Sequence, residues 1–152
     1  MGVSFPQRCL KGDLGPVLFV CVHNAGRSKM AEAFIRRMGL RATSAGTVPA
    51  KEVNRTVVEL MKEKGIDISS DLPRLLTSEM IVEAALVVTM GCSVEQACPK
   101  PMLARMQKKL VEWNTEDPKG KTTEEVRRIR DEIERHVAEL QVSYLTSKAT
   151  NS

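Results

Sequence analysis

The stretch VLFVCVHNAGRSKMAEAFIRRMG, residues 17–39, contains the strongest structural signal in the chain. It opens with an unbroken apolar run at residues 17–22, which is typical of a parallel strand buried on both faces. From Ser28 to Met38 the apolar residues recur at helical spacing, and Gly39 follows where a helix commonly ends. The stretch therefore predicts a buried strand, a short loop and a helix.

The alternation of strands and helices continues along the chain. Apolar segments predict three further strands, at residues 41–45, 85–90 and 110–113. Helical spacing predicts a helix at residues 51–64 and a short one that starts near Thr77. This order of elements favours an α/β fold with an open, mostly parallel sheet and helices on both faces.

The last predicted helix has the clearest pattern. Thr122 and Glu125 have the spacing of a capping box, in which each residue bonds the backbone of the other at a helix start. The apolar residues that follow step by three or four and are Val126, Ile129, Ile133, Val137, Leu140 and Tyr144. We expect the residues from Thr146 onward to form a frayed polar tail.

The loop CVHNAGRS, residues 21–28, has the residue types that hold an oxyanion and attack it. Five residues between Cys21 and Arg27 let successive backbone N–H groups curl around one anion at the start of a helix. Arg27 can grip two oxygens with its planar guanidinium. These features favour the thiolate form of Cys21, which is a strong nucleophile. The predicted oxyanion-binding loop consists of Val22, His23, Asn24, Ala25, Gly26, Arg27 and Ser28.

Each residue of this loop has a predicted part. Gly26 permits a conformation that a Cβ would hinder, and the short amide of Asn24 suits it to hold the loop shape. Ser28 can donate a hydrogen bond to the thiolate, while His23 is expected at the rim. A buried core cysteine at a strand end is the alternative for Cys21. The preceding strand, the following helix and Asn24 favour the catalytic interpretation.

Asp117 is the candidate general acid. It follows the strand predicted at residues 110–113, in a loop at the edge of the sheet where Cys21 is also expected. A carboxylic acid there can protonate the oxygen that leaves a displaced oxyanion. Taken alone, Asp117-Pro118 is an ordinary turn dipeptide. Beside the loop at residues 21–28, we interpret Asp117 as catalytic.

Cys92 and Cys98 are six residues apart and follow the strand predicted at residues 85–90. In a helix six residues rise about 9 Å, whereas a disulfide needs Cα atoms within roughly 7 Å, so a bond would require unwinding. A zinc site is disfavoured because the spacing matches no common motif and His23 and His136 are the only histidines. Two unrelated thiols remain the alternative. We predict no metal and no cofactor.

The composition is that of a globular protein. The chain has 152 residues, of which 42% are hydrophobic and 28% charged, and a domain of this size can bury a core. We expect a flexible polar leader at residues 1–15, a single catalytic domain at 16–145 and a polar tail at 146–152. No apolar run approaches the roughly 20 residues of a membrane span, and no signal peptide is recognisable, so we expect a cytoplasmic protein without membrane contact.

The charge pattern suits a small anion better than a nucleic acid. Lys and Arg number 23 against 19 Asp and Glu, a net charge of +4 that is diluted by the acidic residues. In the last helix arginines alternate with acidic residues, which is typical of a solvated face. No nucleic-acid partner is therefore predicted.

Further motifs accompany the loop: TSAG at residues 43–46, VVTM at 87–90, the Cys92/Cys98 pair, and Glu116-Asp117-Pro118 before a long helix rich in Arg and Glu. With VLFVCVHNAGRSKMAE at 17–32, they make the chain resemble, over roughly residues 16–142, the arsenate reductases that share the low-molecular-weight tyrosine phosphatase fold. The resemblance implies a four-stranded parallel sheet flanked by helices. It also implies arsenic detoxification by a relay of three thiols.

In the implied relay, Cys21 attacks arsenate held by the loop amides and Arg27, and Asp117 protonates the departing oxygen. Cys92 then attacks Cys21, so that a Cys21–Cys92 disulfide forms and arsenite leaves with its electron pair. Cys98 attacks Cys92 and leaves a Cys92–Cys98 disulfide. Thioredoxin is the usual reductant of that bond in the relatives with this arrangement, and phosphate and sulfate are expected to compete with arsenate.

The chain departs from the family in two places. The relatives often have one more residue between the two redox cysteines, and Gly91 precedes Cys92 here. Some relatives bind potassium beside the loop, and Arg74 stands about where the acidic partner of that ion is expected. The residues that match the potassium site are Asn24, Glu32 and Ser44. We do not predict the ion.

A low-molecular-weight protein tyrosine phosphatase, which would use Cys21, Arg27 and Asp117 alone, is the alternative function. Such phosphatases usually line the site with aromatic side chains, for which only Trp113 and Tyr144 are candidates here. They also tend to carry a second cysteine within the loop, where this chain has none. A non-catalytic phosphoprotein-binding module is disfavoured because nucleophile, arginine and acid are all present.

Overall fold

The computed structural model describes the backbone of residues 15–91 and 110–151 and the side chains of residues 15–91 and 110–140. The predicted leader, except its last residue, and the Cys92/Cys98 pair lie outside the described residues. The elements run in the order β2 (Val17–Cys21), α1 (Arg27–Arg37), β3 (Ala42–Gly46), α2 (Arg55–Lys62), α3 (Ser78–Glu83), β4 (Leu86–Met90), β5 (Leu110–Trp113) and α6 (Thr123–Asn151).

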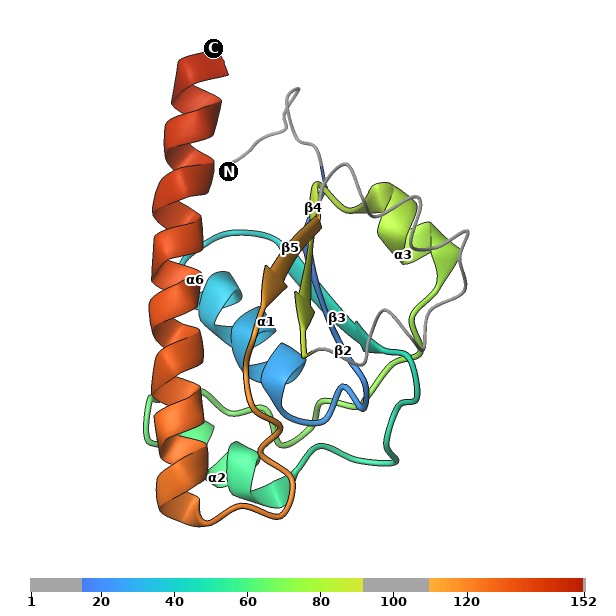
Figure 1. The fold of residues 1–152 in the computed structure, drawn as a ribbon, viewed down its shortest axis with the longest axis vertical. Coiled ribbons are helices and arrows are strands. Elements are labelled where there is room, and N and C mark those ends of the chain that lie inside the picture. Colours follow the sequence, from blue (N-terminus) through green and yellow to red (C-terminus); the bar gives the residue numbers. More distant parts are fainter. Residues whose placement is uncertain (1–14, 92–109, 152) are drawn as a thin grey trace.

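The four strands form one parallel sheet in the order β3-β2-β4-β5. Val17 of β2 lies opposite Ala42 of β3 on one side and Leu86 of β4 on the other. Figure 1 shows α1 and α6 on one side of this sheet and α3 on the other. The predicted α/β class, with helices on both faces of a four-stranded parallel sheet, is confirmed.

Alternate residues of β2 face two separate cores. Phe19 belongs to the larger core, together with Phe34 from α1 and Ile129 from α6. Leu18 faces the other way and packs in a smaller core with Ile81 from α3. Because side chains alternate along a strand, a strand covered on both faces must be apolar throughout. The apolar run of β2 is therefore explained by helices on both sides.

Several predicted boundaries differ from the structure. Strand β3 lies one residue later than expected, and α2 begins at Arg55 instead of residue 51. The side chain of Asn54 accepts hydrogen bonds from the N–H groups of Thr56 and Val57, so that Asn54 caps α2. The expectation of a frayed tail from Thr146 onward is wrong, because α6 continues to Asn151. Residues 141–151 contain neither glycine nor proline, the residues that most readily end a helix.

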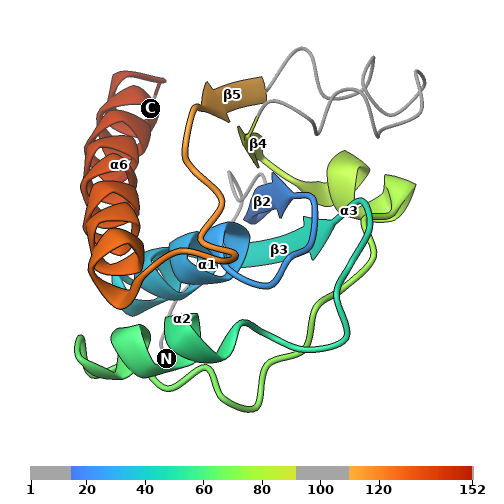
Figure 2. The same ribbon diagram turned by 60° about the horizontal axis from the view of Figure 1, so that its bottom comes forward.

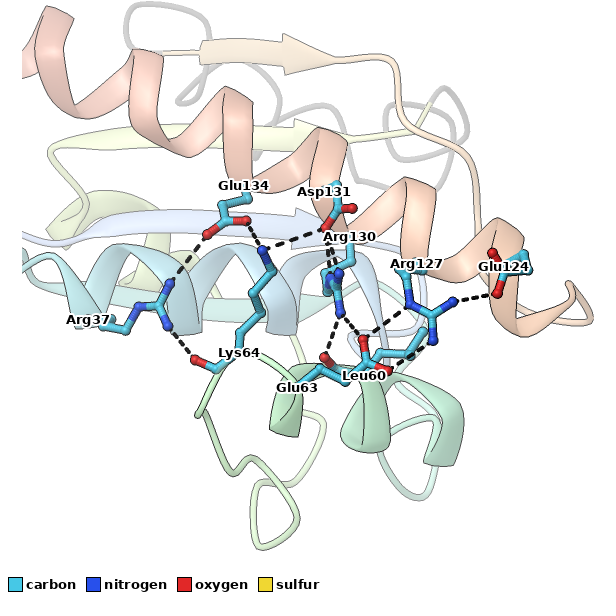
Figure 3. Close-up of polar contacts among 9 residues, drawn as sticks. All are labelled: Arg37, Leu60, Glu63, Lys64, Glu124, Arg127, Arg130, Asp131 and Glu134. Carbon is cyan, nitrogen blue, oxygen red and sulfur yellow. Dashed lines mark hydrogen bonds and ion pairs between the residues drawn. The ribbon is translucent and has the colours of Figure 1, made fainter.

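Helix α6 is joined to α2 by a network of charged side chains (Figure 3). Glu63 accepts hydrogen bonds from Arg127 at 3.2 and 2.9 Å and from Arg130 at 2.7 Å. Arg130, which is buried, also donates to the carbonyl oxygen of Leu60 at 2.9 Å. Figure 3 also draws ion pairs of Lys64 with Asp131 and Glu134, and of Arg37 with Glu134. No helix among the described residues is both long and apolar enough to span a bilayer.

Replacement of Glu63 by glutamine is expected to reduce stability at neutral pH. The hydrogen bonds from Arg127 and Arg130 lower the pKa of Glu63 from 4.5 to about 2. Because the pKa is lower in the folded state, the carboxylate stabilises the fold fully above pH 4.5, and this stabilisation is lost as the pH falls towards 2. The acid limb of the stability profile should therefore be shallower in Glu63→Gln, as measured by thermal unfolding at pH 7, 4 and 3.

Glu124→Gln is the matched control, because Glu124 is largely exposed and, among the described side chains, pairs with Arg127 alone. It is expected to change the profile little, since exposed ion pairs contribute little to stability. Equal slopes for the wild type and Glu63→Gln would contradict the assigned role of Glu63.

Candidate active site

The segment that links β2 to α1 is a tight loop whose carbonyl groups face outward. Its carbonyl oxygens accept backbone hydrogen bonds from the segment after β3, in the pairs Thr47 N–Cys21 O, Val48 N–Val22 O, Ala50 N–His23 O and Asn54 N–Ala25 O. A trans peptide places each carbonyl opposite the N–H of the next residue. The N–H groups of residues 22, 23, 24 and 26 therefore turn towards the inside of the loop.

The sulfur of Cys21 lies at the centre of this loop. The side chain is 2% exposed, and its Sγ lies 3.0 Å from the hydroxyl oxygen of Ser28. The backbone N–H of Asn24 donates to the same sulfur at 3.2 Å. The start of α1, which begins at Arg27, adds the positive end of a helix dipole. These groups stabilise a negative charge on sulfur or on an oxyanion beside it.

Asn24 holds the loop in shape, as the sequence predicts. It has a positive φ of 50°, which its short side chain tolerates, and it is fully buried. Its amide nitrogen donates to the Ser28 hydroxyl at 2.7 Å, and its amide oxygen accepts from the N–H of Arg74 at 2.8 Å. The loop is thus tied to α1 and to the segment that precedes α3.

Arg27 and Asp117 are brought together although they are far apart in the sequence. Arg27 is 7% exposed, and its Nη2 lies 3.8 Å from Oδ2 of Asp117, a carboxylate that is about half exposed. A Cβ on Gly26 would lie 2.7 Å from Cγ of Pro118, so the loop after β5 rests directly on the oxyanion loop. Figure 2 shows that loop passing the start of α1. Asp117 therefore lies at the mouth of the site.

A pocket of about 480 Å³ opens above Cys21, Arg27 and Asp117. Residues 48–50 and 52–55 form one wall, and none of the described lining residues is Phe, Tyr or Trp. Trp113, one of the two aromatic candidates, instead stacks on His136 in the core at a ring distance of 5.0 Å. The side chain of Tyr144 is not among those described.

His23 and the supporting segment complete the rim. Nδ1 of His23 lies 3.2 Å from the carbonyl oxygen of Val48, so His23 contributes to the rim. Residues 47–54, which bond the back of the loop and line the pocket, are not among the site residues predicted from the sequence. The sequence offers one signal for this segment, Asn54. Asn is a preferred residue at a helix start, and here it marks where the connecting segment ends and α2 begins.

The residues that match the potassium site of some relatives do not fit that ion here. Oε1 of Glu32 accepts a hydrogen bond from Ser44 at 2.7 Å and lies 3.7 Å from Nζ of Lys29. Lys29 is 1% exposed, and this burial lowers the pKa of its ammonium group. The amide oxygen of Asn24 accepts from the backbone of Arg74. The candidate oxygen ligands thus have partners within the chain, and two of these, Lys29 and Arg36, are basic side chains at Glu32.

Cys92 and Cys98 lie outside the described residues, but the strand that leads to them is described. β4 is hydrogen-bonded to β2 and ends at Met90. Parallel neighbours end at the same edge of a sheet. The chain therefore enters the segment of Cys92 at the edge where Cys21 lies.

Comparison with known proteins identifies the family. Residues 16–150 match the family described as low molecular weight phosphotyrosine protein phosphatase. The chain is 38% identical over 130 residues to a putative arsenate reductase of Halobacterium salinarum. The aligned region covers 80% of this chain and 87% of the relative.

Two solved structures are also similar. An arginine phosphatase from Geobacillus stearothermophilus has a TM-score of 0.81 at 26% identity, covering 91% of this chain and 97% of that one. A thioredoxin-dependent arsenate reductase from Corynebacterium glutamicum has a TM-score of 0.70 at 35% identity, covering 88% of this chain and 63% of that one. The chain belongs to the low molecular weight phosphotyrosine protein phosphatase family, as its loop, its sheet and these relatives agree.

Proposed function

We propose that the protein is an arsenate reductase that acts in arsenic detoxification, with Cys21 as nucleophile and Cys92 and Cys98 as a disulfide relay. The observation that carries the proposal is the sulfur of Cys21, held inside the loop with Arg27 and Asp117 beside it at one pocket. The similarity to two arsenate reductases supports arsenate as the substrate.

The first step is a displacement at arsenic. Arsenate binds to the inward N–H groups of the loop and to Arg27, which spread its negative charge. The thiolate of Cys21 attacks arsenic, so that a sulfur–arsenic bond forms and an arsenic–oxygen bond breaks. Asp117 gives its proton to the departing oxygen, which leaves as water. Arsenic remains in the +5 state at this point.

The second step transfers the electrons. The thiolate of Cys92 attacks the sulfur of Cys21, and the sulfur–arsenic bond breaks with its electron pair on arsenic, which leaves as arsenite. Cys98 then attacks Cys92, so that Cys21 is released as a thiolate and a Cys92–Cys98 disulfide remains. A dithiol of the thioredoxin type reduces this disulfide and is itself oxidised. Because such reductants work in reducing compartments, we propose a cytoplasmic location.

Arsenite production with and without thioredoxin tests the proposal. With thioredoxin, thioredoxin reductase and NADPH, we expect many turnovers for each enzyme molecule. Without thioredoxin, the reduced enzyme should release a single arsenite and stop, because the relay supplies only two electrons. An absence of arsenite under both conditions would overturn the proposal, and full turnover without thioredoxin would overturn its choice of reductant.

A phosphatase is the alternative, because Cys21, Arg27 and Asp117 suffice to hydrolyse a phosphate monoester. The pocket of about 480 Å³ has room for an organic substituent, which favours this reading. The described wall nevertheless offers no Phe, Tyr or Trp to sandwich a phenyl ring, and Trp113 belongs to the core. We therefore favour reduction of arsenate.

Replacement of Asp117 by asparagine is expected to slow the first step by about 10²–10⁴-fold, because a positioned general acid contributes on that scale. Because a general acid acts in its protonated form, the variant should also lose the fall in rate from acidic to neutral pH that such an acid produces. Single-turnover arsenite release measured across pH 5–8 gives both quantities.

Glu116→Gln provides the control for this prediction. Glu116 is the neighbouring carboxylate, but it pairs with Lys121 and Arg128 instead of Arg27. Its replacement should leave the rate within a few-fold of the wild type. Equal rates for the wild type and Asp117→Asn would contradict a catalytic role and would leave Asp117 as an ordinary turn residue.

A further inference from the structure

Gly91, the residue after β4, lies directly against the guanidinium of Arg27. A Cβ at Gly91 would overlap Nη1 of Arg27 and would lie 3.3 Å from its Cζ. Gly91 also has a φ of +117°, a conformation that residues with side chains rarely adopt. Its N–H donates to the carbonyl oxygen of Trp113 at 3.2 Å, which holds the backbone in this place. The contact therefore depends on the absence of a side chain.

The guanidinium is also contacted from the loop after β5. Nη1 of Arg27 donates to the carbonyl oxygen of Thr115 at 3.4 Å, and Nη2 lies 3.8 Å from Oδ2 of Asp117. Arg27 is almost completely buried between these groups and the backbone of Gly91. A side chain at residue 91 would therefore force the guanidinium to move relative to the oxyanion loop.

We infer that Gly91 is a positioning residue for Arg27, which gives the guanidinium the room to lie where it grips two oxygens of an oxyanion. The role of Arg27 in this inference rests on the proposed function. Gly91 is covalently bonded to Cys92, so the chain segment that carries the relay thiol starts from the backbone that confines the oxyanion-binding arginine.

Arsenate binding by isothermal titration calorimetry tests the inference without chemistry, in protein that carries Cys21→Ser. In this background Gly91→Ala is expected to raise the dissociation constant of arsenate by about 10- to 100-fold, because charged hydrogen bonds of that strength are lost. Gly65→Ala is the matched control. Gly65 has a φ of +78°, but a Cβ there meets nothing within 4 Å, so it adds backbone strain without a new contact.

A double-mutant cycle separates displacement of Arg27 from general damage to the fold. In an Arg27→Ala background, Gly91→Ala should weaken arsenate binding no further, because the affected group is absent. Should Gly91→Ala alone fail to fold, the double variant should be more stable than Gly91→Ala, since the clashing atoms have been removed and only the backbone strain at residue 91 is left.

Three outcomes would overturn the inference: unchanged binding by Gly91→Ala, equal losses in Gly91→Ala and Gly65→Ala, or additive losses in the cycle. A double variant as unstable as Gly91→Ala would do so as well. Failure of the proposed function is distinguishable, because the wild type would then bind arsenate and release no arsenite while the cycle behaved as expected. No arsenate binding by Cys21→Ser protein would overturn both.

Discussion

Replacement of Cys21 by serine is expected to abolish arsenate reduction while the protein remains folded. A hydroxyl is a far weaker nucleophile than a thiolate at neutral pH, and serine cannot form the disulfide through which electrons reach arsenic. Turnover should therefore fall to the background rate, measured as arsenite produced in the complete thioredoxin system.

The fold of Cys21→Ser should persist because serine can keep the local contacts. Its hydroxyl can accept from the N–H of Asn24 and bond the hydroxyl of Ser28, as the sulfur does in the structure. Thermal unfolding and arsenate binding provide the controls, and both should stay close to the wild type. Near-normal turnover by this variant would remove Cys21 as the nucleophile, and with it the whole proposed reaction.

Cys98→Ser is expected to stop the enzyme after one turnover, with Cys21 and Cys92 joined by a disulfide. Cys92 can still attack Cys21 and release arsenite, but no second thiol is present to free Cys21. Hydrolysis of p-nitrophenyl phosphate needs only Cys21, Arg27 and Asp117, so any such activity of the reduced protein should survive in Cys98→Ser. Mass mapping of the cysteines after a single exposure to arsenate identifies the trapped bond.

Cys9→Ser is the matched thiol control, because Cys9 belongs to the predicted leader and has no part in the proposed relay. It should leave arsenite production unchanged. In the wild type, arsenate should join Cys92 to Cys98. Finding both as free thiols while arsenate is reduced would exclude the relay, and a small-molecule thiol would then have to resolve Cys21.

The sheet and the oxyanion loop could be predicted because their signals are local. The apolar run of β2 reflects burial on both faces, which any sequence window over residues 17–22 detects. Cys21 and Arg27 are separated by only five residues in one loop, so their proximity follows from connectivity. The prediction that Asp117 lies near Cys21 also required the rule that parallel strands end at a common edge of the sheet. The observed pair of Arg27 and Asp117 agrees with that prediction.

The remaining features depend on contacts that no local pattern encodes. The hydrogen-bond donors that turn the loop carbonyls outward are backbone N–H groups of residues 47–54. Because nearly every residue type has a backbone N–H, the amino-acid sequence does not reveal these donors. The close approach of Gly91 to Arg27 joins residues 64 positions apart. Lys29 reads as an ordinary helix-surface lysine, yet the structure buries it beside Glu32. Such features require the tertiary structure.

The oxyanion loop also bears on how arsenate is told apart from phosphate. The outward carbonyl bonds and the Asn24 contacts fix the shape of the loop through groups of the protein itself. Its inward amides and Arg27 recognise a charged tetrahedron, a shape that arsenate and phosphate share. Discrimination in the proposed reaction therefore falls on the redox step, since As(V) accepts two electrons from sulfur and phosphorus does not. Abundant phosphate would slow such an enzyme by occupying the oxyanion loop. The enzyme would act selectively on arsenate because only arsenate can be reduced by the thiols.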